Sequence, residues 1–397
     1  MKPNPLSTNP YRELFLLDPE IIFLNHGSFG ATPRPVFATY QRWQLELERR
    51  PVEFLGRRAD ELMQTARARL GAYLHTAADN LVFVTNATHG LNIIARSLSL
   101  GPDDEVLASD HEYGALDRTW RFLAGKHGFK YINIPIPLPV TTVDDFVNDF
   151  FSHVTPRTRV IFLSHITSPT ALIFPVQTIC DRARAAGILT VIDGAHAPGQ
   201  IPLDLDDLGA DFYSGNLHKW LCAPKGSAFL YAAPRVQHLV EPLVVSWGWQ
   251  SDHPGTSPFI DILQWTGTRD LSPFLAVTDA IDFQESHHWP AVRQRCHALA
   301  METQRQIHQL TGLEPLNGDH TDWFAQMAAS PLPENTDLDA LKLRLYDEYR
   351  IEVPLVDWAG RKLIRYSYQA YNDESDQAAL LAALTEVLPA LSSSARI

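Results

Sequence analysis

The sequence places an acid and a lysine at the ends of two neighbouring predicted strands. Residues 189–192, Leu-Thr-Val-Ile, are typical of a buried parallel strand, and they end at Asp193. The next predicted strand, residues 211–214, leads into a loop that holds Lys219. Because the carboxyl ends of the strands face the ligand crevice in open α/β sheets, we expect both side chains at one site. A lysine that forms a Schiff base and a carboxylate that keeps a pyridine nitrogen protonated are the two requirements of pyridoxal phosphate (PLP).

A turn of small residues supplies a second candidate binding element. The predicted strand 81–85 runs into residues 86–90, Asn-Ala-Thr-His-Gly, and a helix is predicted over 91–98. Free N–H groups and the helix dipole favour an anion at such a helix N-terminus. The turn lacks the spacing G-x-G-x-x-G, which disfavours a nicotinamide-binding Rossmann protein. It therefore predicts a phosphate site.

These motifs together resemble the class V aminotransferases, a family of fold-type I PLP enzymes. The pattern D-x-A-H at residues 193–196 and S-x-x-x-H-K at 214–219 carries the resemblance. Four further phrases are most similar to the isopenicillin N epimerase-like group of this family: N-H-G-S-F-G (25–30), D-H-E-Y-G-A (110–115), N-L-H-K-W (216–220) and W-T-G-T-R-D (265–270). The resemblance spans residues 23–372.

The resemblance implies an α/β fold-type I transferase with two domains. A large PLP-binding domain, residues 21–268, would hold a mostly parallel seven-stranded sheet, and the strands counted from residue 81 alternate with helices. Residues 269–397 would form a smaller α+β C-terminal domain, and residues 1–20 an N-terminal arm that packs with it. Helices are predicted over 36–75, 272–307 and 338–350, a capped helix start over 141–145, and a loop-rich connection over 233–265.

The resemblance also assigns roles to single residues. Lys219 would carry the cofactor and later act as the base at Cα, and Asp193 would bind the pyridine nitrogen. His111 would stack on the ring, and His196 would hydrogen-bond its phenolic oxygen. The phosphate would be held by Ala87, Thr88, His89, Asn216 and His218, together with Thr268 from the other subunit of a homodimer with shared active sites.

A separate set of residues is expected to bind the substrate. Arg365 matches the arginine that grips the substrate α-carboxylate, for which a planar guanidinium is suited; a strand arginine paired with an acid is the alternative. Asn25, His26 and Tyr113 are also predicted to contact the substrate, although for His26 a plain turn is an equal alternative. Residues 167–170, Thr-Ser-Pro-Thr, lack the asparagine that the desulfurases of the family carry in this loop, so the cofactor contact of this loop stays open.

Composition narrows the class of protein. A formal net charge of −13 over 397 residues argues against a nucleic acid or an anionic membrane as the partner. We find no apolar run of about 18 residues and no signal-peptide pattern, and so expect no membrane span. The three cysteines (Cys180, Cys222 and Cys296) lack metal-ligand spacing, so no metal site is predicted, and they indicate a reducing, cytoplasmic location.

The reaction is the least determined feature. A desulfurase needs a nucleophilic cysteine on a mobile loop of the small domain, and no cysteine follows Cys296, which argues against that activity. The resemblance implies an epimerase or racemase that acts at Cα of an amino-acid substrate through a Schiff base. A cysteine-conjugate C–S lyase (β-elimination) and an aminotransferase stay open. A binding module without chemistry is disfavoured because both Lys219 and Asp193 are present. Trp247 and Trp249 suggest a substrate larger than alanine, or packing at a dimer interface.

Overall fold

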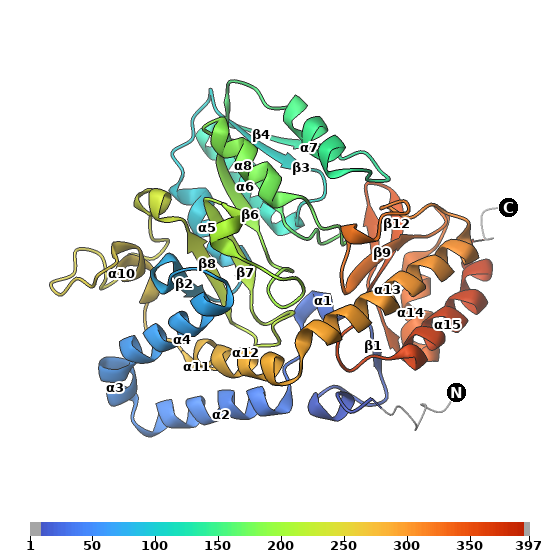
Figure 1. Ribbon diagram of the computed structural model, residues 1–397, viewed down its shortest axis with the longest axis horizontal. Helices are drawn as coiled ribbons and strands as arrows, with labels where there is room; N and C mark the ends of the chain where they lie inside the picture. The colour runs from blue at the N-terminus through green and yellow to red at the C-terminus, as the bar shows by residue number, and fades with distance from the viewer. Residues whose placement is uncertain (1–8, 393–397) are drawn as a thin grey trace.

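The computed structural model describes residues 9–392, and a seven-stranded sheet forms its centre (Figure 1). Its strands are β2 (Leu81–Val84), β3 (Glu105–Ser109), β4 (Lys130–Ile134), β5 (Thr158–Ser164), β6 (Leu189–Asp193), β7 (Phe212–Asn216) and β8 (Ala228–Ala232). They lie in the order β2-β8-β7-β6-β5-β3-β4, and only β8 in this sheet runs opposite to the others. The predicted fold class is confirmed.

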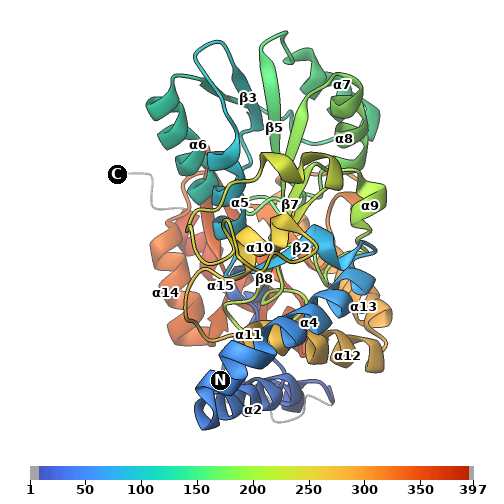
Figure 2. The same ribbon diagram turned by 90° about the vertical axis from the view of Figure 1, so that its left-hand side faces the viewer.

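Helices cover both faces of this sheet. They are α5 (Ala87–Ser97), α6 (Gly114–His127), α7 (Val143–Ser152), α8 (Val176–Ala185) and α9 (Leu205–Leu208). Figure 2 shows α6 on one side of the sheet and α7, α8 and α9 on the other. Every residue of β2, β3, β7 and β8 is buried, as expected when a largely parallel sheet is covered on both faces. The predicted helix start at 141–145 is confirmed, because Thr142 accepts a hydrogen bond from the Asp145 N–H at 3.1 Å.

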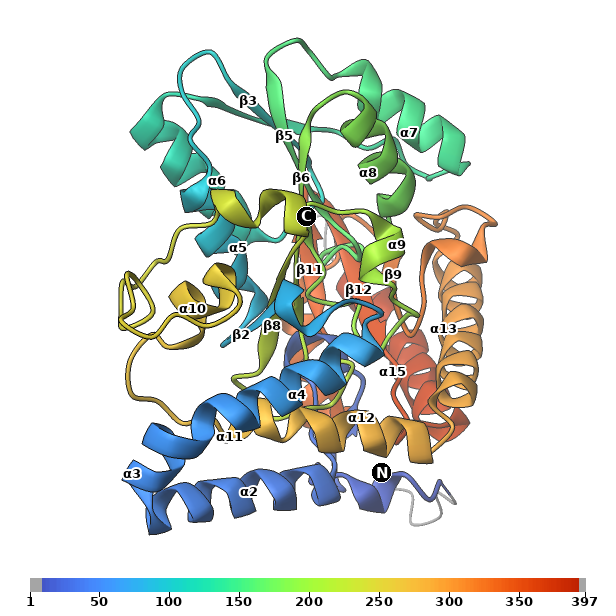
Figure 3. The ribbon, with the colours of Figure 1, turned by 60° about the vertical axis from the view of Figure 1, so that its left-hand side comes forward.

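The helical pattern predicted over residues 36–75 is confirmed, but it does not form one continuous helix. The chain forms α2 (Arg34–Arg49), α3 (Pro51–Glu53), a π-helical turn η2 (Phe54–Arg58) and α4 (Ala59–Tyr73). Arg50 leaves the helical region with φ −148° and ψ 66°, and Pro51 has no N–H to continue the helix. The chain therefore folds back, and α2 and α4 both pack against the helix α12 (Val277–Ser286), as Figure 3 shows.

The helix predicted over 272–307 is also broken. It divides into α11 (Ser272–Leu275), α12 and α13 (Trp289–Thr311), and His288 between the last two has φ +50°. Pro290 follows in the first turn of α13, where its missing N–H has no consequence. Because α11 and α12 pack on α2 and α4, we propose that the domain boundary lies near His288 rather than at 269. The predicted loop region 233–265 also contains a short helix, α10 (Pro258–Gln264), and a 3-10 helix, η4 (Pro234–Leu239).

A smaller C-terminal domain follows. Its antiparallel sheet has the order β11 (Leu355–Trp358), β12 (Arg361–Ser367), β9 (Met327–Pro331), and it is accompanied by α13, α14 (Leu338–Tyr349) and α15 (Glu374–Ser392). The helix predicted over 338–350 is confirmed, and Asp337 caps it. The early strand β1 (Ile22–Phe23) pairs with β10 (Ile351–Glu352), so the chain crosses between the domains near residue 25.

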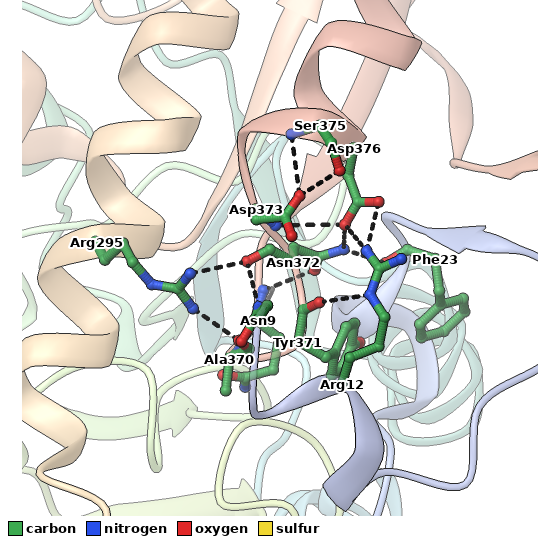
Figure 4. A network of polar contacts seen from close by, with 11 residues as sticks. Asn9, Arg12, Phe23, Arg295, Ala370, Tyr371, Asn372, Asp373, Ser375 and Asp376 are labelled. Carbon is green, nitrogen blue, oxygen red and sulfur yellow. Dashed lines mark hydrogen bonds and ion pairs between the residues drawn. The ribbon is translucent and has the colours of Figure 1, made fainter. Parts of the chain in front are cut away.

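The described part of the N-terminal arm is fastened to the end of the chain (Figure 4). Arg12, in the short helix η1 (Arg12–Leu14), contacts both carboxylate oxygens of Asp376 at 2.7 Å. The side-chain amide of Asn9 donates to the carbonyls of Ala370 and Asn372 at 2.9 and 3.1 Å. These contacts hold the loop that carries Tyr371 against the arm.

Candidate active site

Polar side chains from several strands meet at one edge of the large sheet. Asp193 ends β6, Asn216 ends β7, His111 follows β3, and Lys219 lies in the loop after β7. This is the edge where parallel strands of an α/β fold present residues to a ligand. The structure therefore brings the main residues predicted from the sequence to one location.

The side chain next to Lys219 is a neutral histidine of defined tautomer. The Lys219 Nζ lies 3.1 Å from His196 Nε2, and the indole N–H of Trp220 donates to His196 Nδ1 at 3.3 Å. Burial, followed by the charge of Lys219, lowers the pKa of His196 well below its usual range. Because an indole can only donate, Nδ1 accepts and the ring proton lies on Nε2. His196 therefore presents an N–H to the lysine.

Lys219 is held close to its neutral form. Burial lowers its pKa, and the positive charge of Arg365 lowers it further, whereas Asp193 opposes both. Burial raises the pKa of Asp193, and the Ala195 N–H, which donates to Asp193 Oδ1 at 2.9 Å, opposes this rise. A deprotonated lysine amine is a nucleophile and can take up a proton. The lowered pKa of Lys219 therefore favours the free amine that both predicted roles require.

The N-terminus of α5 keeps donors available for an anion. Asn86 caps the helix by accepting from the His89 N–H at 2.8 Å, and the Ala87 N–H donates to Asn216 Oδ1 at 2.9 Å. The N–H and hydroxyl of Thr88 make no hydrogen bond to any residue in the described range 9–392. Thr88 is therefore not the helix cap, and its donors fit a phosphate. Asn216 fixes this turn through its oxygen, and only its amide NH₂ can donate.

Three other predicted contacts remain predictions. His218 Nδ1 lies 3.0 Å from the Ser227 carbonyl, so the ring proton is on Nδ1. Burial lowers the pKa of this histidine to about 4, and the neutral ring therefore has no proton on Nε2 to donate to a phosphate. Thr268 is exposed in the loop after α10, as expected of a residue that reaches another subunit. Tyr113, which precedes α6, is 45% exposed at the surface.

His111 is enclosed by neighbouring side chains. Its Nδ1 lies 2.7 Å from Thr170 Oγ1, and its ring centroid is 4.3 Å from that of Trp358. Its Nε2 is buried without a hydrogen-bond partner among the described residues. Burial lowers the pKa of His111 to about 3, so the ring is neutral. Stacking of this ring on the cofactor stays a prediction.

Arg365 is a buried cation that lacks a carboxylate partner. One guanidinium nitrogen donates to the Ser168 carbonyl at 2.5 Å and to its hydroxyl at 3.2 Å, and the other donates to Ser28 Oγ at 3.2 Å. No acid in the described chain forms an ion pair with it, and its Nε has no partner, which excludes the alternative of a strand arginine paired with an acid. Burial lowers its pKa only to about 10, so it stays charged at neutral pH. A buried unpaired guanidinium calls for an anion.

The two residues of the N-H-G-S-F-G motif that were predicted to contact the substrate, His26 and Asn25, make hydrogen bonds to other residues of the protein. His26 is fully buried, with Nδ1 3.0 Å from the Tyr371 hydroxyl and Nε2 3.0 Å from the Lys219 carbonyl. His26 thus contacts the backbone of Lys219, and its contact with a substrate stays a prediction. Asn25 donates to Glu352 at 3.0 Å and accepts from the Ser28 hydroxyl at 2.5 Å. Asn25 therefore positions Ser28, which sequence reasoning missed.

The residues fit the cofactor that the sequence predicts. The donors of Thr88 suit a phosphate, the deprotonated Lys219 suits an aldehyde, and Asp193 suits a protonated ring nitrogen. Arg365, whose guanidinium has no acidic partner, is available to bind a substrate carboxylate. Thr88 and Arg365 in particular carry donors that no group of the described chain engages with a negative charge.

Comparisons with known proteins agree with this arrangement. The sequence model of the family "Aminotransferase class-V" matches residues 31–353. The chain is 38% identical to the isopenicillin N epimerase of Amycolatopsis lactamdurans, over 95% of this chain and 97% of that one. It is 35% identical to the isopenicillin N epimerase of Streptomyces clavuligerus, over 92% and 94%. Identity to a probable L-cysteine desulfhydrase of Arabidopsis thaliana is 26%, over 94% and 84%. The solved structure of a cysteine desulfurase from Thermococcus onnurineus has the same fold, with a TM-score of 0.82 at 18% identity, over 98% and 100%.

Proposed function

Because this chain belongs to the class-V aminotransferase family of PLP-dependent enzymes, we propose that it is an epimerase-like enzyme acting at Cα of an amino-acid substrate. The observation that carries the proposal is the unpaired, buried guanidinium of Arg365 beside a lysine of lowered pKa. The first can hold a carboxylate, and the second can take the proton from the neighbouring carbon.

Thr88 and the N-terminus of α5 would hold the cofactor phosphate, Asp193 its ring nitrogen, and Lys219 its aldehyde carbon. PLP supplies an aldehyde that binds an amino group and a ring that accepts the electrons released at Cα. We also propose that His111 stacks on this ring, that His196 donates to its phenolic oxygen, and that His89 and His218 lie near the phosphate.

The protein side chains select the bond that breaks. Arg365, supported by Ser28 and Ser168, would fix the carboxylate at two points and so orient Cα towards Lys219. The Lys219 amine then removes the proton, and the N–H of His196 keeps the amine in place beforehand. Inversion of the centre would need a proton delivered to the opposite face of Cα by solvent or by a second acid.

A C–S lyase is the second candidate, because the chain is also similar to L-cysteine desulfhydrases. Desulfurase chemistry is disfavoured by the cysteines themselves. All three thiols are buried, and burial raises the pKa of Cys180 and of Cys296 to about 12. A nucleophilic cysteine needs a thiolate and access to the substrate.

We further propose a cytoplasmic homodimer with shared active sites, in which Thr268 of one subunit contacts the phosphate in the other. The end of the molecule formed by α3, α10 and the segment before α10 supports this (Figure 1), because it exposes large apolar side chains such as Val52 and Trp247. The three unpaired thiols fit a reducing compartment. Across residues 9–392, every helix is too short or too polar to span a bilayer.

The experiment is an exchange assay in deuterated water. The PLP-loaded protein is incubated with isopenicillin N, a panel of L-amino acids and cysteine conjugates, and the products are analysed by mass and chirality. Deuterium at Cα with loss of chirality would support the epimerase. Pyruvate with a released thiol would identify a lyase. Conversion of the cofactor to its pyridoxamine form would identify an aminotransferase.

Lys219→Ala is the control for the cofactor assignment. We expect this variant to lose both the visible band of the lysine–cofactor linkage and turnover, because Lys219 is the lysine that lies beside His196 and Asp193. Lys225 of the same loop donates instead to the Gly30 carbonyl. An unchanged spectrum in the variant would refute the assignment of Lys219.

A further inference from the structure

The β11–β12 hairpin of the C-terminal domain reaches the active site at two points. Trp358 of β11 lies directly opposite Arg361 of β12, so their side chains share one face of the sheet. Arg365 lies four residues beyond Arg361 and therefore on the same face. One face of a single hairpin thus carries both the carboxylate-binding arginine and a tryptophan.

Trp358 contacts the turn that carries His111. Its indole N–H donates to the Asp110 carbonyl at 3.0 Å, across 248 residues of sequence. Its ring centroid lies 4.3 Å from that of His111, with the planes at 49°. The hairpin turn beyond it is fixed by two residues with positive φ, Ala359 at +49° and Gly360 at +80°. The indole is therefore presented by a defined backbone, at a contact between the two domains.

The other contacts of this turn come from the large domain. The His111 N–H donates to Ser109 Oγ at 3.1 Å, and this hydroxyl donates to the buried carboxylate of Glu112 at 2.5 Å. Glu112 also accepts from the Ser164 N–H at 2.8 Å, which ties the turn to β5. Backbone and carboxyl contacts fix the turn, and the Thr170 hydroxyl holds the imidazole at Nδ1. The aromatic contact of Trp358 is a second constraint on the plane of this ring, and it comes from the other domain.

We propose that Trp358 is a positioning residue that links the carboxylate site at Arg365 to the plane of the His111 ring. A carboxylate bound at Arg365 holds the hairpin against the large domain, and Trp358 then holds His111 in the orientation in which it stacks on PLP. The inference rests on the proposed function, in which His111 lies over the cofactor ring.

The test uses the PLP-loaded protein and two variants of graded effect. Trp358→Phe keeps an aromatic ring and removes the N–H, and Trp358→Ala removes both. The readouts are the visible circular dichroism of the bound cofactor, the rate of cofactor release, and the dichroism response to sodium propionate as the carboxylate probe. Asp357→Asn is the matched control, because this neighbouring side chain points to Lys362 on the other face of the hairpin.

We expect Trp358→Phe to release the cofactor about fivefold faster, the effect of one lost neutral hydrogen bond. Trp358→Ala should release it faster still, with a reduced dichroism band and no response to propionate, while Asp357→Asn behaves like the wild type. If Trp358→Ala keeps the wild-type band, release rate and propionate response, the inference is overturned, even where its melting temperature falls. A wild-type protein without any visible band would refute the proposed function itself and this inference with it.

Discussion

At the scale of single residues, Arg365 acts on Lys219 as well as on a carboxylate. Its positive charge is the second cause, after burial, of the lowered pKa of Lys219. In Arg365→Gln this charge is absent, so the pKa of Lys219 rises and less free amine is present at neutral pH. We expect cofactor capture at pH 7 to slow by about fivefold for the first unit of pKa rise, with the midpoint of the pH profile moved upward. Stopped-flow absorbance of PLP capture by cofactor-free protein measures this.

Lys362→Gln is the control for this charge effect. Lys362 is on the same strand, but its ammonium group pairs with Asp357, away from Lys219. The pH profile of cofactor capture in Lys362→Gln should match that of the wild type. A midpoint that stays in place in Arg365→Gln would show that the arginine charge does not reach Lys219.

The positions of the residues at strand ends could be predicted from the sequence. Asp193 follows an apolar run and Lys219 a recognisable motif, so their convergence at one sheet edge follows from local pattern. The protein contacts of His26 could not be predicted because its partners are distant in sequence, with Tyr371 345 residues away. Trp220 fixes the His196 tautomer from within the H-K-W motif, and the indole next to the lysine was the signal that could have revealed it.

At the scale of elements, the short helix α1 (His26–Phe29) ends against the lysine loop at Gly30. This glycine has φ +70°, and a Cβ there would lie 1.9 Å from the His218 carbonyl. Gly30→Ala must therefore strain its backbone and displace the loop that carries Lys219. We expect a loss of about 2–3 kcal/mol in the free energy of unfolding, measured in urea, together with slower cofactor capture.

Gly56→Ala provides the contrast. Gly56 lies in the helical turn η2, and a Cβ there meets no atom within 4 Å. The substitution should be neutral or stabilise the protein by up to about 1 kcal/mol, because alanine is the better helix former. Equal stability of the two variants would contradict the backbone contact at Gly30.

Strands were easier to predict than helix ends. Strands such as β2, β5 and β6 are short apolar runs bounded by turn residues, a pattern that can be recognised without knowledge of the tertiary structure. The helical period continues across Arg50 and across His288, so pattern alone predicted unbroken helices. Pro51 and Pro290 were the local signals, but the packing of α2, α4 and α12 decides the bends.

At the scale of the whole molecule, contacts between distant segments shape the site. The N-terminal arm holds the C-terminal loop through Arg12 and Asp376, and Tyr371 of this loop contacts His26, which in turn contacts the Lys219 carbonyl. Arg365 and Trp358 reach the site from the other domain, Trp358 at the turn that carries His111. Such pairings join residues hundreds of positions apart and leave no periodic trace in the sequence. The family resemblance predicted the architecture, whereas these inter-domain contacts appear only in the folded chain.

The proposed dimer gives the whole-molecule prediction. Trp247 is 85% exposed and lies in the segment before α10, at the end of the molecule opposite the C-terminal domain (Figure 1). A charge in a buried interface is costly, so Trp247→Asp should weaken self-association at least about tenfold in sedimentation velocity. Leu343→Asp, which changes a 62% exposed leucine of α14, should leave the dimer intact.

The same variants test whether the subunits share their active sites. If Thr268 of one subunit holds the phosphate in the other, dilution of Trp247→Asp to monomer should also release PLP, whereas Leu343→Asp retains it at the same concentration. Thr268→Val should weaken cofactor retention without dissociating the dimer, because it removes a hydroxyl donor and keeps the side-chain shape. A monomer that retains PLP as tightly as the wild type would mean that each chain completes its own phosphate site, and Thr88 with the N-terminus of α5 would then carry the phosphate without help from a partner.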